Sequence, residues 1–289
     1  MDKILFWLKH LLHDAFNSFD SLVNNSVSVL SGGGDAFGWK ADDVWDQITE
    51  LSDNLKPFCL IVIGICLLIE LAQVASKVDI IKWEHGLKIG VKMVFSKLMI
   101  EEAPTFLKAC YIQATAWITA IGTADSVELG QQLGGSIDLE VDKITGNVFQ
   151  PIVLIVVCLI PLMAVKICGL LVEVIAFGRM FELFCLLCVS PLPCAFFPLG
   201  DGSGGGFSRI TRKFFLNFIG VCLHGVMIIV CIRLFGIIMV SAVNSMGMSG
   251  EDPATNISNL CYSMLLGGIV LVMACAKSGQ WAKSILDAG

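Results

Sequence analysis

Charged side chains are scarce in this chain. Only 15% of its 289 residues are Asp, Glu, Lys or Arg, whereas 56% are hydrophobic. Soluble domains carry about 25% charged and about 45–50% apolar residues. The composition therefore excludes an ordinary soluble domain and indicates an integral membrane protein. The formal net charge is -6, which argues against a uniformly basic surface for binding DNA.

Motifs for catalysis and metal binding are missing as well. The sequence has no H-E-x-x-H and no G-x-S-x-G, and its four histidines form no metal-binding set. Asp201–Gly206 is rich in glycine but lacks the lysine of a phosphate-binding loop, which favours a flexible connector. Cys185 and Cys188 have the C-x-x-C spacing without a second pair, which favours packing. We therefore expect no enzyme, no cofactor and no metal.

The N-terminal region predicts two amphipathic helices. Its first helix carries an apolar stripe and lies in the membrane interface or packs on a partner, which the sequence leaves open. We expect no cleaved signal there, because Lys9 and His10 interrupt the apolar core that a signal needs. We expect residues 1–56 to form an extracytoplasmic helical region and residues 57–289 a transmembrane domain. The two stripes are Leu5, Leu8, Leu12, Phe16 and Phe19, then Val44, Ile48, Leu51 and Leu55.

The remaining chain predicts an all-α, polytopic transmembrane protein with about five spans. A span needs about 20 mostly apolar residues to cross roughly 30 Å of hydrocarbon. We expect residues 86–100 to form an interfacial or partly buried helix between the first two spans. The five predicted spans are Pro57 to Ser76, about Pro104 to Ile121, Pro151 to about Leu171, Phe214 to Val243, and Leu260 to Ala276.

Orientation follows from the lysines and arginines, which gather in short cytoplasmic loops. Three basic segments are expected in the cytoplasm: Lys77 to Lys92, Arg209 to Lys213, and the tail with Lys277 and Lys283. The acidic loop of residues 123–150 and the loop of residues 244–259 then lie outside. This predicts an external N-terminus and a cytoplasmic C-terminus in a bacterial cytoplasmic membrane.

One stretch breaks the rules for a lipid-facing helix. The external loop that ends at residue 150 and the cytoplasmic segment that begins at Arg209 are joined by an odd number of membrane crossings. Pro151 to about Leu171 supplies one crossing, so Phe181 to Pro198 must enter the membrane and leave it on the same side. We therefore expect a re-entrant or buried broken helix near 181–198, since irregular backbone at membrane depth must be sheltered from lipid. An additional span beginning at Phe181 is the competing topology.

Three ionisable residues precede this break, and their pairing is open from the sequence. Arg179 and Glu182 lie on one helix face and pair with each other, or Arg179 pairs with Glu173. An interhelical pair that neutralises costly intramembrane charges is the favoured reading, and a lining of a path is the alternative.

The residues of the break itself carry a separate hypothesis. Ser190, Pro191 and Pro193 end a helix and free backbone carbonyls. We predict that this break sets the wall of a central opening when several copies assemble.

Basic residues follow the glycine-rich stretch. Arg209, Arg212 and Lys213 favour contact with anionic lipid headgroups, since each basic residue near an anionic leaflet contributes about 1 kcal/mol. Contact with phosphates of translocating DNA is the alternative. His224, within the next apolar run, is expected to make a hydrogen-bonded helix contact.

The pattern from Arg179 to Val230 resembles the core of the TrbL family, polytopic membrane subunits of type IV secretion and conjugation machines. The resemblance rests on Arg179 with Glu182, Ser190 to Pro193, Phe197 with Pro198, a Gly-Ser-Gly loop, and Gly220 with Gly225 in the next span. It implies a homo-oligomeric, channel-forming subunit that helps move transient single-stranded DNA with attached protein across the cytoplasmic membrane. Partner ATPases of the secretion system are implied as the energy source.

A small-solute secondary transporter is the alternative, because discontinuous helices also occur in such proteins. No inverted internal repeat is visible, which disfavours it. A ring of copies in mild detergent would favour the secretion subunit, and a monomer that binds one solute would favour the transporter.

Overall fold

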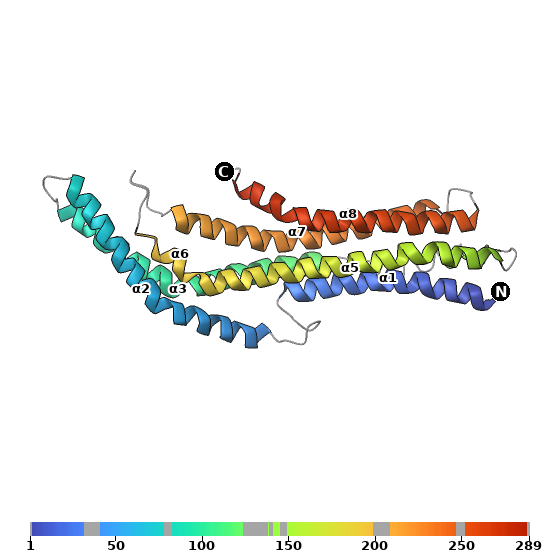
Figure 1. Cartoon of the computed structure of the whole chain (residues 1–289), viewed down its shortest axis with the longest axis horizontal. Helices are drawn as coiled ribbons and strands as arrows, with labels where there is room; N and C mark the ends of the chain where they lie inside the picture. The colour runs from blue at the N-terminus through green and yellow to red at the C-terminus, as the bar shows by residue number, and fades with distance from the viewer. Residues whose placement is uncertain are drawn as a thin grey trace. The chain divides into compact units, whose positions relative to one another are not determined.

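The computed structural model describes residues 2–31, 41–77, 83–123, 138, 141–144, 149–198, 209–246 and 252–287. These residues are helical with short turns and contain no strand, which confirms the predicted all-α fold. The helices are α1 (Asp2–Leu30), α2 (Ala41–Lys77), α3 (Trp83–Thr123), α5 (Phe149–Val189), α6 (Pro191–Ala195), α7 (Arg209–Met246) and α8 (Pro253–Asp287) (Figure 1).

Four stretches of helix within the described residues are long and apolar enough to cross a membrane. They are Val44–Gln73, Pro151–Ala195, Arg209–Val243 and Pro253–Leu286. They contain four of the five predicted spans. The fifth, Pro104 to Ile121, lies in α3, which is helical but does not reach the same hydropathy. Its crossing of the membrane therefore remains a prediction.

The second predicted amphipathic helix is not separate from the first span. Residues 44–55 and the span from Pro57 form one helix, α2, with Pro57 inside it. A proline in a helix interior removes one backbone hydrogen bond, and a long helix with good neighbouring turns tolerates that loss. The proposed division between residues 1–56 and 57–289 remains a prediction.

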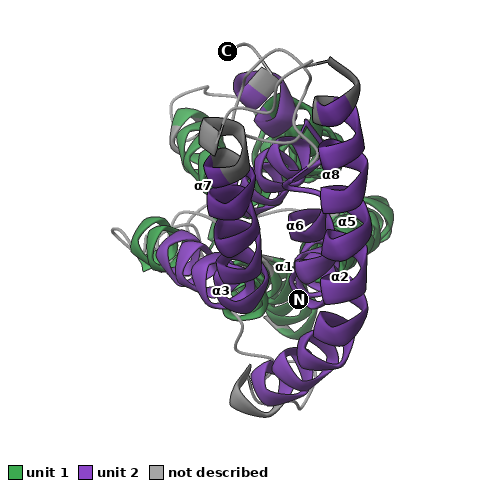
Figure 2. Cartoon of the chain, turned by 90° about the vertical axis from the view of Figure 1, so that its left-hand side faces the viewer, with its two compact units in different colours: residues 1–31, 116–178, 224–281 green, residues 32–115, 179–223, 282–289 purple. Residues whose placement is uncertain are grey.

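The chain divides into two compact units (Figure 2). Unit 1 contains residues 1–31, 116–178 and 224–281, and unit 2 contains residues 32–115, 179–223 and 282–289. Because α3, α5, α7 and α8 contribute residues to both units, we describe each unit by itself.

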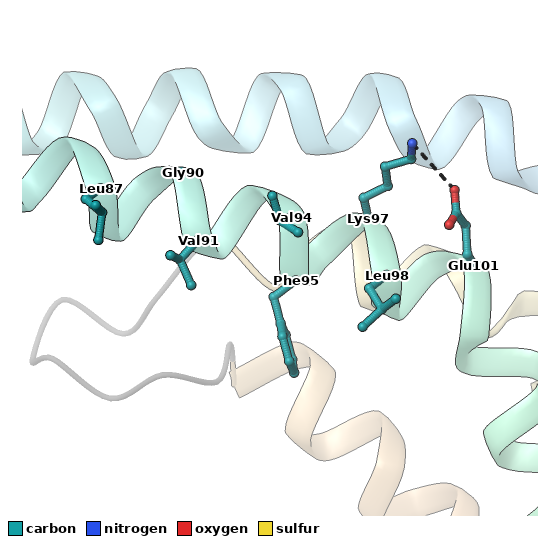
Figure 3. A pocket seen from close by; sticks show the side chains of 8 residues that line it. All are labelled: Leu87, Gly90, Val91, Val94, Phe95, Lys97, Leu98 and Glu101. Carbon is teal, nitrogen blue, oxygen red and sulfur yellow. Dashed lines mark ion pairs between the residues drawn. The ribbon is translucent and has the colours of Figure 1, made fainter.

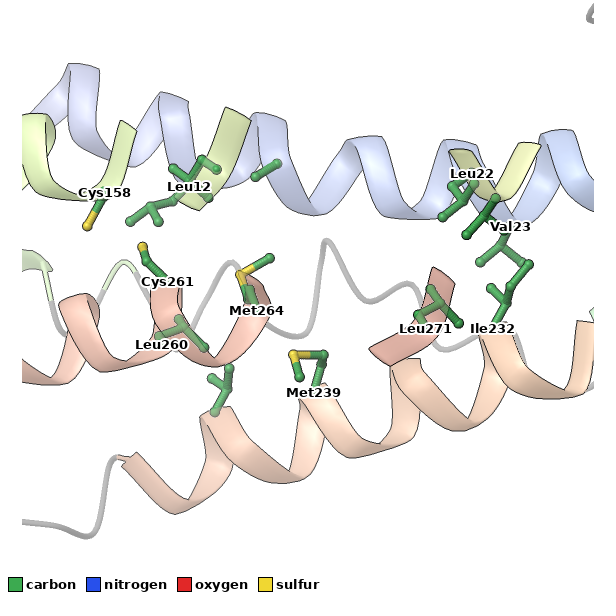
Figure 4. Close-up of a cluster of buried hydrophobic side chains, with 14 of the residues drawn as sticks. Leu12, Leu22, Val23, Cys158, Ile232, Met239, Leu260, Cys261, Met264 and Leu271 are labelled. Atoms are coloured by element: carbon green, nitrogen blue, oxygen red, sulfur yellow. The ribbon is translucent and has the colours of Figure 1, made fainter. Parts of the chain in front are cut away.

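Unit 1 has one hydrophobic core, built by α1, α5, α7 and α8. Figure 4 shows part of it, with Leu12 of α1, Cys158 of α5, Ile232 of α7 and Cys261 of α8 among the labelled side chains. Leu8 and Leu12 are fully buried, which confirms the predicted apolar stripe at those positions. Small residues bring α7 and α8 close together: a Cβ on Gly267 would lie 2.6 Å from Cε2 of Phe235.

Unit 2 has a smaller core beneath the short helix α6. Cys59 and Ile63 of α2, Ile100 and Ala103 of α3, and Cys194 and Ala195 of α6 form this cluster. The core therefore holds α6 against two long helices rather than against lipid.

Candidate functional site

The predicted break in the helix lies at Ser190. Helix α5 ends at Val189, Ser190 forms a turn, and α6 begins at Pro191. The position agrees with proline chemistry, because Pro191 has no N–H to donate to the carbonyl four residues earlier, although Ser190 itself keeps helical backbone angles of φ -54° and ψ -33°. Residues 181–189 continue α5 up to the break, so the broken helix predicted near 181–198 is present, with its two parts meeting at Ser190. Whether this segment re-enters the membrane remains a prediction.

The backbone groups freed by the break find partners within the protein. The Leu187 carbonyl, which Pro191 leaves without its helical donor, accepts from the Ser190 N–H at 3.2 Å. The Pro193 carbonyl accepts from the Thr211 hydroxyl at 2.8 Å and from the Phe196 N–H at 3.4 Å. These two carbonyls are thus satisfied within the protein, as irregular backbone beside lipid requires.

The break is also buried. Ser190 is fully buried, and its hydroxyl has no hydrogen-bond partner among the described residues. Pro191 is buried as well, whereas Pro193 is half-buried. An unpaired buried hydroxyl costs about 1–3 kcal/mol. The residues of the break therefore face protein within one chain, and any contribution to an opening requires other copies.

Thr211 ties the break to the start of α7. Its side chain is fully buried, while its neighbours Arg209, Arg212 and Lys213 are exposed. The bond to Pro193 thus fixes the first turn of α7 and directs three cations away from the core of unit 2. Sequence reasoning missed Thr211, although an uncharged residue among basic ones was a usable signal. The Asp201–Gly206 stretch lies outside the described residues.

The pairing of the three ionisable residues is resolved. Arg179 forms an ion pair with Glu182 on the same face of α5. Glu173 instead accepts a hydrogen bond from the Asn25 amide of α1 at 3.1 Å. Glu173 therefore joins two helices of unit 1, and Arg179 with Glu182 form a local pair in unit 2.

Helix α1 supplies further polar partners in unit 1. Asp14 forms an ion pair with Lys166, which lies inside the apolar sequence of α5. Lys9 pairs with Asp142 at 2.8 Å, and His13 contacts Asp138 at 3.3 Å. The acidic residues predicted to lie outside the membrane thus contact the first half of α1.

Unit 2 contains a second ion pair that the sequence did not suggest. Lys92 of α3 pairs with Glu70 of α2, and only 18% and 14% of their side chains are exposed. The sequence held a usable signal for this pair, because the acidic Glu70 and the basic Lys92 lie in adjacent apolar segments. The pair neutralises two charges that are costly in hydrocarbon.

Aromatic side chains gather elsewhere in unit 2. The Trp45 ring lies 5.2 Å from Tyr111 and 5.5 Å from Phe184, centroid to centroid, with Nζ of Lys108 4.9 Å from the Trp45 ring. The Tyr111 hydroxyl has no partner among the described residues. The cluster ties α2, α3 and the end of α5 together.

A shallow hollow of about 610 Å³ lies on α3, and residues of this one helix line it (Figure 3). Apart from Lys97 and Glu101, which pair with each other, the lining is apolar. Leu87, Val91, Val94 and Leu98 are each more than half exposed. Its chemistry fits lipid or another apolar surface and offers no catalytic group.

In unit 1, the predicted helix contact of His224 is confirmed. Its ring nitrogen lies 3.1 Å from the Cys275 carbonyl, so α7 and α8 meet there. The Ser278 hydroxyl donates to the same carbonyl at 2.8 Å. His224 is thus engaged in helix packing.

These features define a polytopic helical membrane protein whose fifth helix ends in a buried, proline-broken turn. The chain belongs to the family of TrbL/VirB6 plasmid conjugal transfer like proteins, whose family model matches residues 32–191. It is therefore a subunit of conjugal transfer and type IV secretion systems, as the resemblance implied. No curated protein and no solved structure matches the chain.

The match covers a different part of the chain from the one expected. The resemblance was placed on Arg179 to Val230, but the matched region overlaps it only from Arg179 to Pro191. The shared part contains Arg179, Glu182 and the break at Ser190. The family sequence signal thus lies mainly in α2, α3 and α5.

Proposed function

We propose that this protein is a channel-forming, membrane-embedded subunit of a conjugative DNA transfer machine. The family match is the observation that carries the proposal. Four helices long enough to span a membrane support it, because a path for a polar polymer needs several spans around it. In this proposal, DNA with attached protein crosses the cytoplasmic membrane beside copies of this chain.

The break at Ser190 positions the basic start of α7. Through its bond to Pro193, Thr211 fixes where α7 begins, and Arg209, Arg212 and Lys213 project from that end. These cations bind anionic lipid headgroups first and meet DNA phosphates during transfer. We propose that the break and these cations together shape one end of the opening formed by several copies.

The test restores helix at the break. Replacing Pro191 and Pro193 by alanine removes the two residues that stop α5, so α5 and α6 fuse and the Thr211 contact is lost. Transfer frequency from donor cells is expected to fall, with an unchanged amount of protein in the membrane. Pro57→Ala is the matched control, because Pro57 lies inside a helix that is already continuous. Unchanged transfer in the double variant would refute the role of the break.

The assembly and orientation complete the proposal. We propose a homo-oligomer in the bacterial cytoplasmic membrane, with an external N-terminus, a cytoplasmic C-terminus, and contacts to lipids, secretion ATPases and transient single-stranded DNA. Reporters fused at residues 135 and 203 should report the outside and the cytoplasm respectively. The opposite assignment at either position would overturn the orientation.

A solute transporter is the second candidate, favoured only by the broken helix. Purification in mild detergent followed by copy counting separates the two. A ring of several copies supports the transfer subunit, and a monomer that binds a single small solute supports the transporter.

A further inference from the structure

From residue 10 to residue 24, helix α1 has two faces of opposite chemistry, while Phe6 and Trp7 before them are exposed to 66% and 69%. Its buried face carries Leu8, Leu12 and Leu22. Every exposed side chain that the structure describes from residue 10 to residue 24 is polar. These residues follow one another at intervals of four and three, so they form one line along the helix. This polar stripe consists of His10, Asp14, Asn17, Ser21 and Asn24.

Contacts with α5 show which residues of α5 lie beside this stripe. Asp14 pairs with Lys166, and Asn25 donates to Glu173 at 3.1 Å. Between these two bonds, a Cβ on Gly169 would lie 3.8 Å from Leu22. The two helices therefore run side by side in the same direction, with residues 14–25 of α1 beside residues 166–173 of α5.

The same level of α5 has an apolar exposed surface. Ile167, Leu171 and Val174 are exposed to 58%, 43% and 58%. They belong to the Pro151–Ala195 stretch, whose mean hydropathy of 2.7 fits a membrane span. The polar stripe of α1 thus lies at a depth where the neighbouring helix presents side chains suited to lipid.

Lipid is a poor neighbour for the polar stripe. A polar group in hydrocarbon without a hydrogen-bond partner costs several kcal/mol, and a charged side chain there is rare unless it faces a water-filled space or a partner. Two amides, one hydroxyl and one carboxylate lie along the stripe within four turns. Their exposure therefore requires water or another polar surface.

A cavity beside the stripe supports water. It encloses about 290 Å³ between α1, α5, α7 and α8, and its polar lining includes Ser18, Ser21, Lys166 and Glu173. Ser21 belongs both to this cavity and to the exposed stripe. Although most of the remaining lining is apolar, these four polar side chains and the volume give room and partners for water, since one water needs about 30 Å³ and two to four polar partners.

We infer that the polar stripe of α1 faces a water-filled space at membrane depth. The occupant is water, and a lipid tail or a second copy of the chain is an alternative outcome of the test. The inference rests on the proposed function only for what passes through the space. It revises the expectation that residues 1–56 lie wholly outside the membrane.

The test compares α1 with α5 at matched depth. A nitroxide amino acid is introduced by stop-codon suppression, one site at a time, which leaves the twelve native cysteines untouched. The sites on the stripe are Asn17, Ser21 and Asn24, and the matched sites on α5 are Ile167, Leu171 and Val174, none of which lines the cavity. In native membranes, spectra are recorded with oxygen, which enters lipid, and with a water-soluble nickel chelate.

The stripe is expected to be several-fold more accessible to the nickel chelate than to oxygen, and the α5 sites the reverse. Oxygen preference at the stripe would mean lipid contact and overturn the inference. Nickel preference at the α5 sites would place both helices outside the bilayer and overturn it as well. Protection of the stripe from both reagents would reveal a second copy and also overturn it. None of these outcomes depends on DNA transfer, so the proposed function is tested separately.

Discussion

Two exposed stripes of the same spacing but opposite chemistry distinguish α1 from α3. The polar stripe of α1 runs from His10 to Asn24, whereas α3 exposes Leu87, Val91, Val94 and Leu98 at intervals of four, three and four. Helix α1 buries Leu8, Leu12 and Leu22 on its other side, whereas α3 also exposes Met93 and Phe95 in the same stretch. The exposed line of side chains thus indicates whether a helix meets water or lipid, and the composition of the whole helix does not.

The difference explains why mean hydropathy separates these helices poorly. Helix α1 is not among the candidate spans, because polar residues on one face lower its average although Leu8, Leu12 and Leu22 are buried. Helix α3 also fails, because Lys97, Glu101 and Glu102 interrupt an exposed apolar surface. To distinguish a helix beside water inside a membrane protein from a helix beside lipid, the hydropathy of each helix face has to be considered separately.

The largest expected effect lies on the buried face of α1. Leu12→Ala removes a fully buried side chain from the core of unit 1 and should destabilise the protein by about 2–5 kcal/mol. Asn17→Ala, on the polar stripe, should change stability by less than about 0.5 kcal/mol. Thermal unfolding in detergent measures both. Equal effects would show that α1 has no distinct faces.

A charge placed on each stripe gives the next largest effect. Val94 is 71% exposed, and Val94→Asp should cost up to about 3 kcal/mol if lipid covers it. Asn17→Asp should be nearly neutral, because water solvates the new carboxylate. The amount of each variant that is extracted intact from membranes provides the measurement. A similar loss for both variants would contradict the inference that water covers the stripe of α1 and lipid covers the stripe of α3.

Removing the Thr211 hydroxyl compares a polar group that is hydrogen-bonded inside the protein with one that is exposed on the polar stripe, Ser21. Thr211→Val deletes the donor to the Pro193 carbonyl and should cost about 0.5–2 kcal/mol, the range for polar contacts between helices in membranes. Thr211→Ser keeps the donor and should recover most of the loss. Ser21→Ala should have no effect on unfolding. Loss of stability in Ser21→Ala alone would contradict the assignment of Ser21 to water.

The smallest effect is expected at the ion pair beside the stripe. The side chains of Asp14 and Lys166 are 52% and 41% exposed. Ion pairs in contact with water contribute about 0–1 kcal/mol and weaken with salt. Asp14→Asn should therefore cost less than about 1 kcal/mol at low salt and less again at high salt. A larger cost that is independent of salt would indicate that lipid surrounds the pair.

The sequence predicted what depends on local patterns. The spacing of Leu8 and Leu12 identified the buried face of α1, and the apolar runs located four helices that can span a membrane. Pro191 and Pro193 located the break, because proline chemistry acts on the residues next to it. Counting membrane crossings, by contrast, constrains the topology but places no residue in particular.

Long-range pairings were beyond sequence reasoning. Asn25 meets Glu173 across 148 positions, and Glu70 meets Lys92 only because α2 and α3 pack together. Nothing in the local sequence of Thr211 names the Pro193 carbonyl as its acceptor. Such contacts depend on which helices become neighbours, and this is decided by the packing of the whole unit.

The most direct test joins the polar stripe to transfer. Ser21→Cys and Val94→Cys are made separately, and donor cells are treated with a bulky, water-soluble maleimide, with the unsubstituted chain as control for the native cysteines. The account predicts that alkylation at residue 21 reduces transfer, whereas the Val94 variant and the unsubstituted chain keep their frequency. Full alkylation of Ser21→Cys, verified by mass, with unchanged transfer would contradict a water-filled path beside α1.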